Sequence, residues 1–172
     1  MMPSSWLGMI EAFESEGFEI YKGVFNPDEI DKFRVISDAL AAEEKKACVR
    51  GIAAKSAGIL ELAESNALRQ FLPADYLLVR SILFDKTPEE NWPVPWHQDL
   101  SIAVREKKEV EGYGPWSVKD RVVHVQPTSE VLQQMLTLRV HIDPTSESNG
   151  ALRVIRSSNK SGKMKRHPWL KL

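Results

Sequence analysis

The sequence predicts an α+β fold in which helices come first and a sandwich or barrel of short antiparallel strands follows. Two observations predict this order. Apolar residues at helical spacing dominate the first third of the chain, and short apolar runs separated by Pro- and Gly-rich turns fill the remainder. The length of 172 residues suits one domain, so we expect a single domain over residues 1–172.

Composition and charge narrow the classes of function. The formal net charge of −1 gives no overall attraction to nucleic acid, and no apolar stretch is long enough to predict a membrane span. Cys48 is the only cysteine, so an internal disulfide is impossible, as is usual in a reducing compartment. The N-terminal residues lack the pattern of a signal peptide. We therefore expect a cytoplasmic protein with no nucleic-acid partner and no membrane partner.

The first elements are predicted from local signals. A short helix is expected over residues 7–16 and a strand over residues 18–21, where apolar and polar residues alternate. Asn26 is a good helix cap and Pro27 is tolerated at the first helical position. Apolar residues at helical spacing then extend this second helix to about Lys45.

A third helix is predicted over residues 56–65, with a looser continuation that Pro73 ends. Arg50 precedes it at a break in the helical pattern. Its side chain is either an anion-binding group that faces a site or an ordinary surface cation, and the sequence leaves both interpretations open.

The remainder of the chain is predicted to be rich in strands. Residues 76–84 are apolar on nearly both faces, with only Arg80 and Ser81 intruding, which predicts a strand covered on both sides. Short apolar runs bounded by turn residues predict the other strands. The predicted strands are residues 76–84, a segment that starts at His97, and residues 121–126, 135–142 and 151–155.

A His-x-Asp pair stands in the segment WPVPWHQDLS, residues 92–101. In an extended strand the side chains at positions i and i+2 point to the same face, so His97 and Asp99 converge. They would supply two of the three ligands of the 2-His-1-carboxylate triad that holds non-haem Fe(II). The alternative interpretation is a hydrogen bond between the two side chains at a strand edge.

Two further histidines lie on predicted strands. His124 stands between valines, and His141 stands between Val140 and Ile142. Either could be a third metal ligand on a neighbouring strand. The alternative for both is a half-buried histidine with a local hydrogen bond, and for His141 a polar cluster with Arg139 and Asp143.

Five stretches of the sequence together resemble the phytanoyl-CoA dioxygenase family of Fe(II)/2-oxoglutarate-dependent oxygenases. They read VPWHQDLSIAV, GYGPWSVK, HVQP, LTLRVHID and ESNGALRVI, and the resemblance spans roughly residues 26–163. It implies a double-stranded β-helix, or jelly-roll, core with the N-terminal helices packed on one sheet.

The resemblance also implies a site and an activity. His97 and Asp99 would bind Fe(II), and Ile82, Gln98 and Arg139 match positions that contact the co-substrate 2-oxoglutarate. The implied reaction hydroxylates a small organic substrate with O₂, while 2-oxoglutarate is converted to succinate and CO₂; ascorbate is a candidate reductant. The protein would mainly position groups and exclude water.

The family also has a distal histidine ligand and an arginine that pairs with 2-oxoglutarate, both beyond the Asn149-Gly150 turn. Here the residues from about 156 to 172 form a basic, unpatterned tail in which His167 is a poor substitute ligand. We therefore expect a C-terminally truncated domain, either an enzyme with weak iron binding or a non-catalytic remnant. Missing last strands would leave sheet edges unpaired, which predicts marginal stability or self-association.

Overall fold

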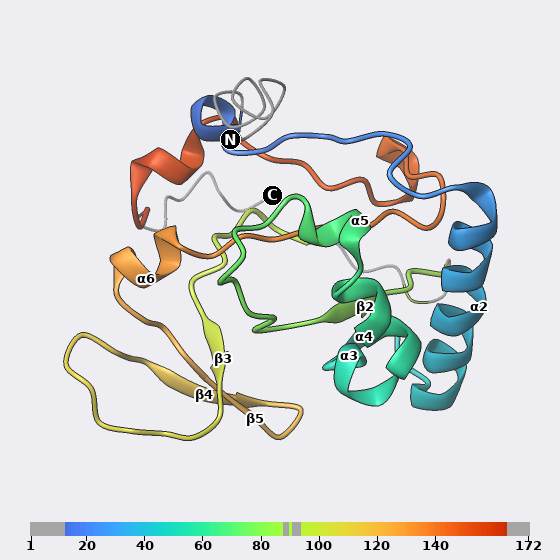
Figure 1. Cartoon of the computed structure of the whole chain (residues 1–172). Coiled ribbons are helices and arrows are strands. Elements are labelled where there is room, and N and C mark those ends of the chain that lie inside the picture. Colours follow the sequence, from blue (N-terminus) through green and yellow to red (C-terminus); the bar gives the residue numbers. More distant parts are fainter. Residues whose placement is uncertain (1–12, 88–89, 91–93, 165–172) are drawn as a thin grey trace.

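The computed structural model of the chain describes residues 13–87, 90 and 94–164 (Figure 1). Helices dominate the N-terminal part, and two small antiparallel sheets follow. This mixture of helix and sheet agrees with the predicted α+β class. None of the helices in these residues is long and apolar enough to cross a bilayer.

Helix α2 (Pro27–Glu44) begins where the sequence predicts. The Asn26 side chain accepts a hydrogen bond from the Glu29 amide at 3.0 Å, and the Glu29 carboxylate accepts one from the Asn26 amide at 2.8 Å. This reciprocal capping box satisfies two amides that the helix leaves unpaired. The helix ends at Lys45, which adopts the left-handed conformation.

Three short helices follow α2. They are α3 (Ile52–Lys55), α4 (Ala57–Ala63) and α5 (Asn66–Arg69), and the Ser56 side chain caps α4. The helix predicted over residues 56–65 is therefore confirmed. Residues 13–16 are also helical and end at Gly17, as predicted; the first six residues of that predicted helix lie outside the described part of the chain.

The hydrophobic core lies where α2, α3 and α4 meet the first sheet. Val49 is its most buried member, with 1% of its surface exposed. Ile36 and Leu83 pack against the cluster from its edge. The cluster consists of Leu40, Val49, Ile52, Ala53 and Ile59.

The first sheet pairs β1 (Cys48–Arg50) with β2 (Ile82–Phe84), and the second has the order β3 (Ile102–Val104), β5 (Val122–Val125), β4 (Trp116–Lys119). All pairs are antiparallel. The β4–β5 hairpin turns at Asp120 and Arg121, both with positive φ, as in the type I′ turns that suit two-residue hairpins. Helix α6 (Ser129–Gln133) and the 3₁₀ helices η1 (Glu147–Asn149) and η2 (Ser158–Ser161) complete the fold.

Most of the predicted strands are wrong or too long. The strand over residues 121–126 is confirmed as β5, but residues 18–21, 135–142 and 151–155 form no strand. Only the end of 76–84 pairs, as β2, and the segment starting at His97 becomes a strand only at Ile102. A strand needs a partner for its backbone N–H and C=O groups, and an apolar pattern does not supply one.

The predicted cover over residues 76–84 is also wrong. Leu77 is 84% exposed and Leu78 is 50% exposed, so no layer buries this run. Conversely, β1 and β4 were not predicted. β1 has only three residues, and β4 starts at Trp116, directly after Gly114 and Pro115.

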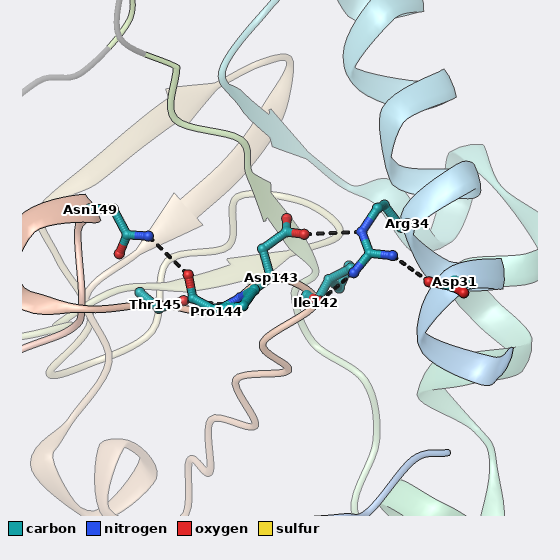
Figure 2. A network of polar contacts seen from close by, with 7 residues as sticks. All are labelled: Asp31, Arg34, Ile142, Asp143, Pro144, Thr145 and Asn149. Atoms are coloured by element: carbon teal, nitrogen blue, oxygen red, sulfur yellow. Dashed lines mark hydrogen bonds and ion pairs between the residues drawn. The ribbon is translucent and has the colours of Figure 1, made fainter. Parts of the chain in front are cut away.

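The predicted turn after residue 142 is present and is held against α2 (Figure 2). The Arg34 guanidinium donates to the Asp143 carboxylate at 3.0 Å and to the Ile142 carbonyl at 3.1 Å, and it also pairs with Asp31. Within the turn, the Asn149 side chain donates to the Pro144 carbonyl at 2.9 Å. The contacts of Arg34 with Ile142 and Asp143 join segments that are more than a hundred residues apart in sequence.

Candidate functional site

The predicted iron ligands lie in the segment that leads into β3. Exposure alternates along it: Trp96, Gln98 and Leu100 are half-buried, whereas His97 and Asp99 are exposed. Extended backbone produces this alternation, because residues two apart share a face. His97 and Asp99 are therefore on the solvent-facing side of the segment, and Trp96, Gln98 and Leu100 are on the side that packs against the protein.

One hydrogen bond sets the tautomer of the His97 ring. Nδ1 lies 2.9 Å from the Pro95 carbonyl oxygen, and a carbonyl only accepts, so Nδ1 must carry the hydrogen. In the neutral imidazole Nε2 is then the lone-pair nitrogen. Metal-binding histidines typically have this arrangement, with the second ring nitrogen held by a carbonyl or a carboxylate. The alternative, a hydrogen bond from His97 to Asp99, does not form in the described structure.

Asp99 faces a cation instead. Its Oδ1 lies 3.7 Å from Nη2 of Arg80, which is an ion pair but is too long for a hydrogen bond. The Asp99 side chain is 67% exposed and that of Arg80 is 28% exposed. The Arg80 charge therefore balances a carboxylate that is open to solvent. In the sequence, Arg80 is distinguished only as a charge within an apolar run, and this signal does not predict its contact with Asp99.

Gln98 and Trp96, on the other side of the segment, contact residues 153–164. The Gln98 amide donates to the Gly162 carbonyl at 2.8 Å, and its oxygen accepts from the Met164 amide at 2.8 Å. The Arg153 guanidinium lies 5.1 Å from the centre of the Trp96 ring, within the range of a cation–π contact. Residues 153–164 thus cover the face opposite the His-x-Asp pair.

The other predicted site residues lie on separate elements. Ile82 is half-buried on β2, directly opposite Arg50. Arg139 is exposed in the irregular segment after α6. In the part of the chain that the structure describes, no hydrogen bond or ion pair joins Ile82 or Arg139 to His97 or Asp99. Asp99 thus contacts Arg80, two residues before Ile82. Arg139 has no hydrogen bond or ion pair with either predicted iron ligand among the described residues.

The remaining described histidines have local partners, as the simpler interpretation predicts. His124 is 2% exposed, and its Nδ1 donates to the Val122 carbonyl at 2.9 Å. His141 Nδ1 donates to the Thr145 hydroxyl at 3.0 Å, since that hydroxyl gives its own hydrogen to the Asp143 carbonyl. Burial, followed by the nearby charge of Arg139, lowers the pKa of His141.

The donor set fits two of the three positions in a facial iron site. Across residues 13–87, 90 and 94–164, no group of three His, Cys, Asp or Glu side chains could hold a metal ion. His167 lies outside the described residues. His97 and Asp99 are exposed, and Asp99 is paired with Arg80. The described residues do not complete the triad, so we derive no reaction step through iron.

Comparison with known protein families supplies the decisive observation. The family model described as phytanoyl-CoA dioxygenase (PhyH) matches residues 13–171, nearly the whole chain. The chain belongs to the phytanoyl-CoA dioxygenase family. The match confirms the resemblance seen in the sequence, and membership implies chemistry of the Fe(II)/2-oxoglutarate oxygenase type. Curated proteins and solved structures gave no match.

Proposed function

We propose that this phytanoyl-CoA dioxygenase family member is an Fe(II)/2-oxoglutarate-dependent oxygenase that hydroxylates a small organic substrate. His97 and Asp99 are its first two iron ligands. The observation that carries the proposal is the His97 ring, whose Nδ1 is held by the Pro95 carbonyl while Nε2 has no partner among the described residues and the nearby Asp99 carboxylate is exposed. Family membership supports the assignment.

The chain's own residues would position this pair. The Pro95 carbonyl orients the His97 ring, and Arg80 holds the Asp99 carboxylate until a cation replaces it. Gln98 anchors the segment between the two ligands. When bound, iron supplies the oxidation of a C–H bond, with O₂ and 2-oxoglutarate consumed and succinate and CO₂ released.

The co-substrate contacts and the complete fold belong to the same proposal. Ile82, Gln98 and Arg139 are proposed to contact 2-oxoglutarate, on the strength of their positions in the family pattern. The two antiparallel sheets are proposed to be parts of a jelly-roll core. Mapping chemical-shift changes on addition of 2-oxoglutarate tests the contacts, because all three residues should respond together.

Succinate release tests the activity. Purified chain is incubated with Fe(II), ascorbate, 2-oxoglutarate and O₂, and succinate is measured against the variant His97→Ala. His141→Ala is the matched control, because His141 is also exposed but lies outside the proposed site. We expect succinate from the wild type and from His141→Ala only. Equal succinate from the wild type and His97→Ala removes the proposal for this chain.

A second function is favoured by the incomplete donor set. With two donors among the described residues, the chain could be a non-catalytic member of the family. A titration of metal-free protein separates the two hypotheses. Micromolar binding of Fe(II) or 2-oxoglutarate contradicts the non-catalytic hypothesis, whereas the absence of both supports it.

A further inference from the structure

A hollow of about 210 Å³ lies between the two sheets. One wall comes from β1, α3 and the residues that precede β2, and the other comes from β3 and the β4–β5 hairpin. A cavity of about 150 Å³ can hold benzene, so this hollow has room for a small ligand somewhat larger than benzene.

The lining combines an apolar wall with cationic side chains. Arg50, Arg80 and Lys119 supply the positive charges, and no Asp or Glu among the described residues lines the hollow. Small-molecule sites commonly have this composition, an apolar surface with a few polar groups that fix orientation. It suits a ligand with an apolar body and a negative group. The apolar wall consists of Ala53, Ala54, Leu78, Val79, Ala103 and Val122.

Arg80 is the cation best placed to bind the negative group. Its side chain is 28% exposed, and its contact with Asp99 is an ion pair at 3.7 Å. The described structure shows no hydrogen bond from its guanidinium, although the group has five N–H donors in a planar fork that matches a carboxylate. These donors are reached by solvent and are therefore accessible to a ligand carboxylate.

The other polar side chains of the hollow differ in how many hydrogen bonds and ion pairs they already form with the protein. Arg50 already donates to the Asp120 carboxylate at 2.9 Å, so it helps to shape the wall. Lys119 is exposed and forms no ion pair within the described residues. His124 is buried, and its Nδ1 is bound to the Val122 carbonyl, while its Nε2 has no hydrogen-bond partner among the residues that the structure describes.

We propose that this hollow binds a small monocarboxylic acid with a short apolar chain. The carboxylate binds Arg80, and the chain lies along the alanine and valine wall. Because Arg80 also faces Asp99, the hollow is next to the proposed iron ligands, which makes the acid the substrate of the oxygenase. That role as substrate depends on the proposed function, whereas the binding itself needs no iron.

Calorimetry with metal-free protein tests the binding. Hexanoate is the probe, and hexanamide is a neutral molecule of nearly the same shape. Hexanoate should bind and hexanamide should bind at least tenfold more weakly, because charge-assisted hydrogen bonds contribute more than neutral ones. Arg80→Gln should weaken hexanoate binding about tenfold or more, and Arg80→Lys should have an intermediate effect because lysine keeps the charge but lacks the fork.

Arg105→Gln is the matched control, since Arg105 is exposed after β3 and does not line the hollow. It should bind hexanoate as the wild type does, and thermal melting checks that every variant is folded. Equal binding of hexanoate and hexanamide, or unchanged binding in both Arg80 variants, overturns the proposal. So does displacement of hexanoate by a lower concentration of 2-oxoglutarate, which would give the hollow to the co-substrate.

The two proposals fail separately. Hexanoate binding without any succinate release in the assay above would remove the oxygenase function and keep the acid site. Succinate release without hexanoate binding would remove the acid site and keep the oxygenase function.

Discussion

Asp120 sits at the tip of the β4–β5 hairpin and joins it to the first sheet. Its carboxylate accepts a hydrogen bond from Arg50 on β1 at 2.9 Å, and Lys46 lies 3.9 Å away. The hydrogen bond from Arg50, followed by the charges of Arg50, Lys46 and Lys55, lowers the pKa of Asp120. The contact therefore links ionisation at a single residue to the way the two sheets meet around the hollow.

The lowered pKa of Asp120 predicts a loss of stability in acid. A carboxyl whose pKa is lower in the folded state stabilises the fold above its ordinary pKa of 3.8, and this stabilisation is lost as the pH falls through the folded-state value. Asp120→Asn should lower the urea midpoint at pH 7 and narrow the difference between pH 7 and pH 3. Asp75→Asn, at an exposed position, is the control. An unchanged pH dependence in Asp120→Asn would contradict the prediction.

His141 gives a second prediction at the residue scale. Its lowered pKa means that the unfolded chain binds the proton more readily, so stability is complete above the ordinary pKa of 6.5 and falls as the pH drops below it. Arg139→Gln removes the second cause of the shift and should raise the pKa of His141 in an NMR titration. Arg105→Gln should leave it unchanged, and the same result for Arg139→Gln would refute the electrostatic cause.

At the scale of elements, local signals were predictable and long-range pairing was not. Asn26, Pro27 and Glu29 predict the start of α2 because the capping box is formed within four residues of sequence. Residues 135–142 have the apolar pattern that predicts a strand, but they form none, because a strand depends on a partner elsewhere in the chain.

The candidate site shows the same division. The spacing of His97 and Asp99 predicts that they share a face, and both are exposed in the structure, while their role as iron ligands stays a prediction. Of the two interpretations for His124 and His141, the structure shows the local hydrogen bonds. The sequence could not predict the approach of Arg80 to Asp99, because that contact depends on how the segment before β2 lies against the segment before β3.

The two hydrogen bonds of the Gln98 side chain, to Gly162 and Met164, give a prediction for residues 162–164. The Met164 amide donates only to the Gln98 side chain within the described structure, so Gln98→Leu should speed hydrogen exchange at Met164. Mass spectrometry or NMR can measure this exchange. Gln133→Leu, at an exposed position on α6, should not change it. Equal exchange in the wild type and Gln98→Leu would show that the Gln98 hydrogen bonds do not hold residues 162–164.

Across the whole molecule, one run of apolar side chains is conspicuously exposed. Leu77 to Val79 are between 39% and 84% exposed. Exposed apolar patches of this kind mark association surfaces or aggregation-prone regions.

We propose that the chain self-associates through Leu77, the most exposed residue of this run, which does not line the hollow. Sedimentation velocity should show dimers or larger species at micromolar concentration, and Leu77→Lys should shift the distribution toward the monomer. Val35→Lys is the matched control, because Val35 is 69% exposed on α2, away from the run. A stable monomer at all concentrations would contradict the proposal.

Iron stoichiometry shows whether His97 and Asp99 hold a metal ion. Metal-free protein is equilibrated with Fe(II) under anaerobic dialysis, and bound iron per chain is measured for the wild type, His97→Ala, Asp99→Asn and the control His141→Gln. The account predicts one iron per chain in the wild type and the control, with clear loss in both site variants. Wild-type protein without bound iron, or iron bound equally by all four proteins, would contradict it.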